Sequence, residues 1–115
     1  MNKQQMNGYY RQATKMASKI YNLFMETFAD IPCVVYCVGT ERWQDHVNVE
    51  VWATIGNGKA SDDLRELVGN FTKTFSFASY RSENAADFFA RIQNEIQPFA
   101  RKAKNVQEIV NNDKQ

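Results

Sequence analysis

Two cysteines, Cys33 and Cys37, lie four residues apart in the segment IPCVVYCVG, residues 31–39. A helical segment would place them close enough for redox chemistry, but valines and a tyrosine between Pro32 and Gly39 favour a strand. On a strand the two residues are about 13 Å apart, whereas a disulfide needs Cα atoms within about 7 Å. The same separation excludes a shared metal. We therefore predict that both thiols are reduced, point into the core and react slowly.

Two further features could carry chemistry, and neither is favoured. His46 is the single histidine, and Asp45 beside it points to the opposite face of a strand. The turn GNGKAS, residues 56–61, stands between a strand and a helix, as phosphate-binding loops do. However, Asp62 and Asp63 follow it and would place negative charge where a phosphate binds. We expect no catalytic residue, no metal and no cofactor, and we predict that the protein is not an enzyme.

The N-terminal element is predicted to be a long amphipathic helix over residues 3–29. Gly8 weakens its first turn, so ordered helix is expected to start near Tyr9. Pro32 disfavours helical backbone at the residue before it, so the helix ends by Asp30. Its apolar positions recur at steps of three and four residues: Met6, Tyr9, Ala13, Met16, Ile20 and Leu23.

A β-hairpin is predicted next, with strands on either side of a five-residue loop, residues 40–44. The second strand, HVNVEVWATI, alternates apolar and polar residues. If Gly39 faces Asp45, the two cysteines and Val35 share a face with the inward valines of the second strand. Residues 71–80 fit a strand or a helix, and we favour a strand.

Two more helices complete the chain. Residues 62–68 form a short helix with Ser61 as its N-cap, ended by Gly69. Residues 83–110 form a long one with Ser82 as its N-cap. Pro98 falls inside the long helix, opposite its apolar stripe, so we predict a helix bent at the proline with the ring toward solvent.

These elements predict a single domain, residues 1–115, of the α+β class in the order α-β-β-α-β-α, with both long helices on one face of a small antiparallel sheet. The last helix would be longer than such a sheet can cover. Val106 and Val110 then need another surface, which the first helix or a second copy could supply. We favour a homodimer formed through the helices.

The opposite sheet face is the candidate binding surface. In the expected register it carries Tyr36 and Trp52, and Trp43 stands at the hairpin tip with Arg42 and Glu41 as a polar rim. Tryptophan and tyrosine dominate interaction hot spots, and an exposed loop is an unusual place for a large apolar ring. The short helix or a loop could instead cover this face. Its expected members also include Val34, Val38, His46, Asn48, Glu50 and, if the third strand forms, Tyr80.

Basic residues Arg11, Lys15 and Lys19 are spaced by four along the first helix and would form one exposed stripe. The stripe is most simply a solvated face. Together with Tyr36 and Trp52 it would also suit single-stranded nucleic acid, through phosphate contacts and base stacking.

Composition separates these alternatives only weakly. The net charge is +1, with 43% hydrophobic and 23% charged residues, so the overall field attracts no polyanion. No apolar run reaches the ~20 residues of a membrane span, and the N-terminus does not read as a signal peptide. With two cysteines, we expect a cytoplasmic protein. The favoured function is a small protein–protein interaction module, and the alternative is a small nucleic-acid-binding protein.

Overall fold

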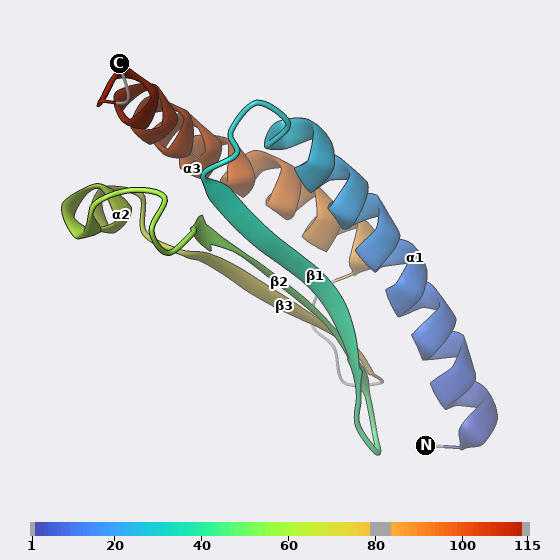
Figure 1. Cartoon of the computed structure of the whole chain (residues 1–115). Helices are drawn as coiled ribbons and strands as arrows, with labels where there is room; N and C mark the ends of the chain where they lie inside the picture. The colour runs from blue at the N-terminus through green and yellow to red at the C-terminus, as the bar shows by residue number, and fades with distance from the viewer. Residues whose placement is uncertain (1, 79–83, 114–115) are drawn as a thin grey trace.

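The computed structural model describes residues 2–78 and 84–113, and it confirms the predicted α+β class and element order (Figure 1). Residues 71–77 are a strand, as favoured. The three strands form one antiparallel sheet in the order β1-β2-β3. In chain order the elements are α1 (Lys3–Thr27), β1 (Val34–Arg42), β2 (Val47–Ile55), α2 (Asp62–Val68), β3 (Phe71–Phe77) and α3 (Ala85–Asp113).

Helix α1 begins at Lys3, six residues earlier than Gly8 suggested. A capping box accounts for the difference. The Asn2 side chain accepts a hydrogen bond from the Gln5 N–H (2.8 Å), and the Gln5 side chain accepts one from the Asn2 N–H (3.1 Å). Two otherwise unpaired donors are thereby satisfied, and this offsets the weak helix propensity of glycine.

The hairpin register differs from the predicted one. Gly39 faces Glu50 instead of Asp45, because β1 continues to Arg42 and only Gln44 and Asp45 form the turn. The Trp43 N–H donates to the His46 carbonyl oxygen (2.9 Å) and closes this turn. An odd shift in register moves every side chain of one strand to the other face.

This shift places Tyr36 on the helix-facing side of β1 and Cys37 on the opposite side. Tyr36 packs against Tyr21, Phe24 and Phe28 of the first helix and its end, with ring centroids 5.6–5.9 Å apart. A face with Val34, Tyr36 and Val38 buries more apolar area than one with two cysteines and Gly39. Packing against α1 therefore favours the observed register.

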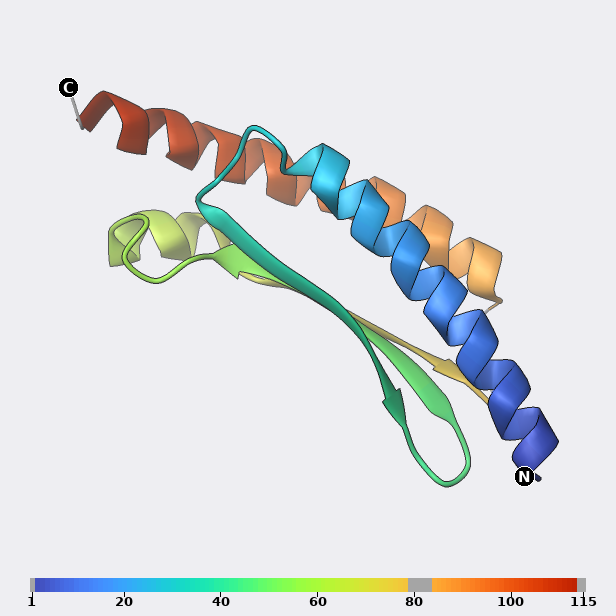
Figure 2. The same cartoon turned by 45° about the vertical axis from the view of Figure 1, so that its right-hand side comes forward.

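Both long helices cover the same face of the sheet, as predicted (Figures 1 and 2). Helix α1 crosses β1 and β2, and α3 packs on β3 and α1. The core between the layers is built from alternate residues of the strands and one stripe of each helix. Its largest fully buried members are Phe24, Phe77, Phe88, Ile20, Ile55, Ile92, Ile96, Val47, Val49 and Val51.

Helix α2 spans the predicted residues, with Ser61 accepting a hydrogen bond from the Leu64 N–H (3.4 Å). It lies beyond the sheet, against the C-terminal part of α3. Leu64 and Val110 are partly buried against the core, and Val106 is buried. Val110 lies beside Leu64 and the turn before α2, so these two valines do not by themselves require a second copy. The homodimer through the helices stays a prediction.

Helix α3 contains Pro98 on its exposed side, as predicted. The expected cap, Ser82, lies outside the described residues, and Asn84 accepts a hydrogen bond from the Asp87 N–H (2.8 Å) at the helix start. Further along, Gln107 is a buried polar residue with 7% of its surface exposed. Its Oε1 accepts a hydrogen bond from the Cys33 N–H (2.7 Å), which ties α3 to the segment entering β1.

The molecule is long and thin, with principal extents of 58 × 23 × 20 Å and a radius of gyration of 16.4 Å. A compact chain of this length has a radius of about 13 Å. The elongation follows from two layers: the helices lie on one side of the sheet, and no described element lies on the other (Figure 2).

Candidate functional site

The uncovered face of the sheet carries a tryptophan near its centre. Trp52 is 42% exposed and stands on β2 between Cys37 of β1 and Thr72 of β3. Val35, which is also exposed, neighbours Cys37 along β1. Apart from Gly39, Glu41 and Glu50, the remaining positions are short polar residues. Two hydrogen bonds link β2 to β3 and to the turn before it: Ser76 to Asn48 (2.5 Å) and Thr54 to Asn70 (2.6 Å). We call this surface the open face.

Two carboxylates stand at the hairpin end of the open face. Glu50 faces Gly39 across the strands, and Glu41 lies one pair further toward the turn. A hydrogen bond with Glu41, and then partial desolvation and the Glu41 charge, raise the pKa of Glu50 above its ordinary value. Two neighbouring carboxylates are not easily ionised together, because their negative charges repel each other. This end of the face therefore attracts cations and repels phosphates.

The hairpin tip presents the second tryptophan. Trp43 is 50% exposed and stacks on the His46 ring, with centroids 6.0 Å apart and planes at 15°. The His46 Nδ1 atom lies 2.5 Å from Asp45 Oδ1. The hydrogen bond from His46 holds the pKa of Asp45 below its ordinary value. The histidine is thus engaged in the turn itself, which fits a structural role.

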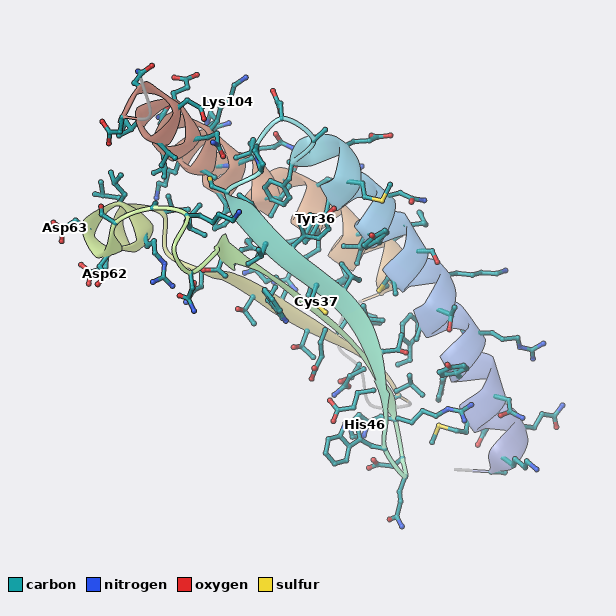
Figure 3. The ribbon with its side chains drawn as sticks, viewed as in Figure 1. Tyr36, Cys37, His46, Asp62, Asp63 and Lys104 are labelled. Carbon is teal, nitrogen blue, oxygen red and sulfur yellow. The ribbon has the colours of Figure 1, made fainter. Side chains whose placement is uncertain are left out.

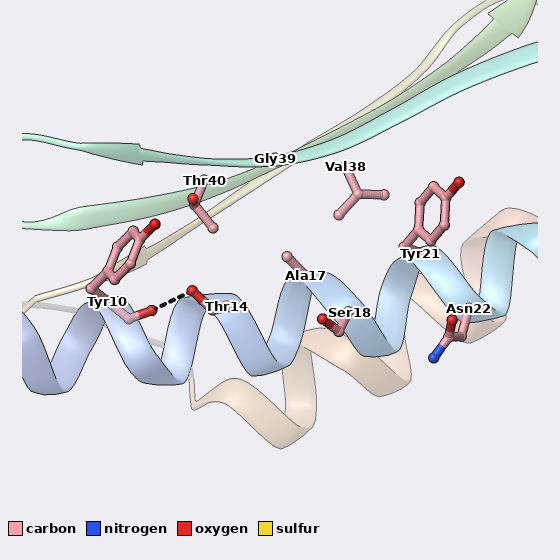
Figure 4. Close-up of a pocket in the computed structure, with 9 residues that line it drawn as sticks. All are labelled: Tyr10, Thr14, Ala17, Ser18, Tyr21, Asn22, Val38, Gly39 and Thr40. Carbon is pink, nitrogen blue, oxygen red and sulfur yellow. Dashed lines mark hydrogen bonds between the residues drawn. The ribbon is translucent and has the colours of Figure 1, made fainter.

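A groove runs between α1 and the outer edge of β1 (Figure 4). Its volume is about 440 Å³, and α1 contributes Tyr10, Ala17 and Tyr21 while β1 contributes Val38 and Thr40. The Arg42 guanidinium lies 4.0 Å from the ring centre of Tyr10, which lines the groove. The groove is an open hollow on the surface, and it lies along β1, an outer strand of the sheet.

The three residues of the predicted basic stripe, Arg11, Lys15 and Lys19, are all exposed on α1. Lys19 lies over the Phe89 ring of α3, 4.5 Å from its centre, so it belongs to the contact between the helices. Arg11 and Lys15 are exposed and line a shallow hollow with Tyr10. A role of this stripe in docking therefore stays a prediction, with Lys19 also contacting α3.

The five predicted partner-binding residues are divided between two surfaces. Trp52 and Glu41 lie on the open face, and Trp43 lies at the hairpin tip. Tyr36 is half-buried on the helix side, between β1 and α1 (Figure 3), and Arg42 turns toward Tyr10. The prediction that Tyr36 and Trp52 share a face is wrong, as it is for Val34 and Val38, because of the register shift. Tyr80 lies outside the described residues.

The cysteines also differ from the prediction. Cys33 is buried, as expected, and its Sγ lies 3.8 Å from the Ala103 carbonyl oxygen. Burial raises the pKa of the Cys33 thiol. Cys37 is exposed on the open face, so the prediction that both thiols are buried is wrong for Cys37. Both are free thiols. Sequence reasoning missed Cys37 and Val35 as surface residues for the same reason, the parity of the hairpin.

Within residues 2–78 and 84–113, the structure shows neither a metal-binding cluster nor a membrane-spanning helix. No cluster of three or more histidine, cysteine or acidic side chains could hold a metal ion there. No helix in this part of the chain combines the length and apolarity needed to cross a bilayer. In comparisons with protein-family models, curated proteins and solved structures, none matched the chain.

Proposed function

We propose that this chain is a small non-enzymatic protein–protein interaction module that binds its partner through the open face. The observation that carries the proposal is Trp52. A large ring stands 42% exposed in the middle of a sheet face that no described element covers. Tryptophans in central positions supply much of the binding energy of protein interfaces. Directly across the strands from it stand the short side chains of Cys37 and Thr72, while the charged residues Glu41 and Glu50 lie toward the hairpin end of the face.

The hairpin end adds specificity to this surface. Glu41 and Glu50 form an acidic rim, so the partner is expected to place a lysine or arginine opposite them. Trp43 extends the surface at the tip. The cytoplasmic location is part of the proposal, since an exposed thiol such as Cys37 stays reduced in a reducing compartment.

Affinity capture from the native host tests the proposal with matched baits. Trp52→Ala removes the central ring, while Leu67→Ala removes an apolar side chain on α2 that is even more exposed and lies outside the open face. Wild type and Leu67→Ala are expected to retain the same protein partner, measured by quantitative mass spectrometry, and Trp52→Ala is expected to lose it at least tenfold. Trp43→Ala is expected to weaken capture without lowering the melting temperature, because its ring is half exposed. Equal capture by wild type and Trp52→Ala would contradict the proposal.

The nucleic-acid alternative rested on Tyr36 and Trp52 sharing a face with a basic stripe nearby. A single tryptophan beside two carboxylates is a poor site for a phosphate backbone. Anisotropy of a labelled single-stranded oligonucleotide, measured at increasing salt, is therefore expected to show no binding. Binding that weakens steeply with salt and is lost in Trp52→Ala would favour nucleic acid as the partner.

A further inference from the structure

The outer edge of β1 is an unpaired row of backbone groups. Hydrogen bonds at the two ends of the hairpin, from Gly56 N–H to Cys33 O and from Trp43 N–H to His46 O (both 2.9 Å), show that odd-numbered residues of β1 bond to β2. The even-numbered residues Tyr36, Val38 and Thr40 therefore point their N–H and C=O groups outward. Within the described chain no strand pairs with this edge, and in Figure 1 β1 lies in front of the other two strands.

The two edges of the sheet are treated differently. On β3, Lys73 points inward and pairs with Glu95 of α3 (3.2 Å), and an inward charge is a common device against edge-to-edge pairing. Strand β1 has nine residues paired with β2 without a bulge and contains no lysine or proline. Its helix-side charge, Arg42, lies at the hairpin end over the Tyr10 ring, away from the middle of the strand. A long, regular edge without a central charge is a template for a further strand.

Helix α1 carries a second apolar stripe beside this edge. Tyr10, Tyr21 and Met25 are three of the large apolar residues that remain exposed, and Tyr10 and Tyr21 line the groove against β1 (Figure 4). At the middle of the groove, where Val38 and Gly39 lie, α1 offers only Ala17 and Ser18. A strand added to β1 would thus place its helix-side residues along this stripe, with the closest approach at small residues.

The accessible area of the molecule leaves room for a second copy on its surface. The accessible surface is 7291 Å² for a chain of 13.3 kDa, whereas a compact monomer of this mass exposes about 6,500 Å². The excess, roughly 800 Å², is about the area that each partner buries in an interface of standard size. A short peptide on the edge would cover less than this, whereas a second copy brings a strand and a helix.

We infer that two copies of this chain pair antiparallel through their β1 strands about a two-fold axis at Val38, forming a continuous six-stranded sheet. Val38 is the midpoint of β1, and its backbone faces the free edge, so pairing about it uses the whole strand. In this register Tyr36 faces Thr40 of the second copy, and Glu41 faces Val35, so no like charges are opposed. The inference rests on the proposed function in one respect only: the dimer is the form that would bind the partner. Edge pairing leaves both open faces uncovered, so each copy could still bind through Trp52.

Disulfide trapping tests the register. Cys37 would lie opposite Gly39 of the second copy in a non-hydrogen-bonded pair, with Cα atoms about 4.5 Å apart, within disulfide range. A Cβ at Gly39 meets nothing within 4 Å, so Gly39→Cys is accommodated. Under mild oxidation Gly39→Cys is expected to run almost entirely as a dimer on a non-reducing gel. Val35→Cys is the matched control, because it adds a thiol on the same face of the same strand but about 13 Å from Cys37 of the second copy. Equal cross-linking of the two variants, or none in either, would refute the register.

Light scattering at micromolar concentration tests the edge itself. Wild type is expected to have the mass of a dimer. Val38→Pro removes an N–H that bonds to nothing else in the described chain, so it is expected to give a folded monomer, while Val38→Thr keeps the N–H and the dimer. A monomeric wild type would overturn the inference. A Val38→Pro dimer with native circular dichroism would assign the dimer to another surface. If Val38→Pro does not fold, the cysteine pair still decides.

The same variants separate this inference from the proposed function. A Val38→Pro monomer that still captures the protein partner through Trp52 would support both. A monomeric wild type with Trp52-dependent capture would remove the dimer and leave the proposed function. A dimeric wild type, together with partner capture that Trp52→Ala does not weaken, would support the dimer and contradict the proposed function.

Discussion

The two cysteines differ sharply in their surroundings, because Cys33 precedes β1 beside α3 and Cys37 stands on the open face. Cys37 is exposed, whereas Cys33 is buried beside Ala103, where desolvation raises the pKa of its thiol. Because the thiolate is the reactive species, we expect a thiol reagent to label Cys37 rapidly. Cys33 is expected to react only when the protein unfolds locally or globally. Cys37→Ser is expected to abolish the rapid phase alone, followed by absorbance. Two rapid phases in the native protein would contradict the burial of Cys33.

The carboxylate pair on the open face makes stability depend on pH. The pKa of Glu50 is raised in the folded state by Glu41, so between the ordinary and the raised value the folded protein binds more protons than the unfolded chain. Stability from this group is present below the ordinary pKa of 4.5 and is lost as pH rises through the raised one.

Glu50→Gln removes this dependence. We expect the variant to be more stable than wild type at neutral pH, and the difference to shrink as pH falls below the ordinary pKa. Urea unfolding at a series of pH values measures it. Glu66→Gln, an exposed site on α2, is the control and is expected to change little. A difference that grows toward acid pH would show that the carboxylates do not interact.

At the scale of elements, one side chain fixes α3 to the entry of the sheet. Gln107 accepts from the Cys33 N–H and donates from Nε2 to Asn111 Oδ1 (3.0 Å). Gln107→Leu leaves a buried N–H without an acceptor, which is expected to cost about 1–3 kcal/mol. Asn111→Ala removes only the outer hydrogen bond and is expected to cost less than about 0.5 kcal/mol. Chemical denaturation of both variants provides the comparison, and a Gln107→Leu protein as stable as wild type would show that the bond is dispensable.

The elements themselves could be predicted from the sequence, and the register could not. The apolar periodicity of α1 and α3, the Ser61 cap and the alternation in β2 all led to the observed elements. Strand β1 is apolar at both odd and even positions, so either parity was plausible, and Gln44-Asp45 carries no Gly or Asn turn signal. Contacts of Tyr36 with α1 decide the register, and such tertiary contacts lie outside any local pattern.

The same parity explains the fate of the predicted binding site. Trp52 and Trp43 could be identified because they are large apolar residues on an alternating strand and at a hairpin tip. Tyr36 was assigned to the wrong face with its strand. Tyr10, Tyr21 and Met25 also recur at helical spacing in α1. They can be recognised as a separate, exposed stripe only once the buried stripe is known to be Ala13, Met16, Ile20 and Phe24.

At the scale of the whole molecule, a two-layer sandwich leaves two kinds of unfinished surface. The open face lacks a third layer, and the β1 edge lacks a neighbour in the plane of the sheet. These surfaces are perpendicular to each other, so one partner can bind the face while another chain extends the edge. Pairing about Val38 would set two open faces side by side, and a partner with two copies of its own binding site would then gain strength from simultaneous attachment.

Both tryptophans lie on the surface, whereas the core is built from phenylalanine and aliphatic residues. Their emission in the folded protein should already resemble that of tryptophan in water, so it should shift little when the chain unfolds in urea. The tryptophan emission wavelength is therefore expected to change little on denaturation, and to change clearly when a partner contacts the open face or the hairpin tip. In this protein, tryptophan fluorescence is expected to report on partner binding, and circular dichroism on folding.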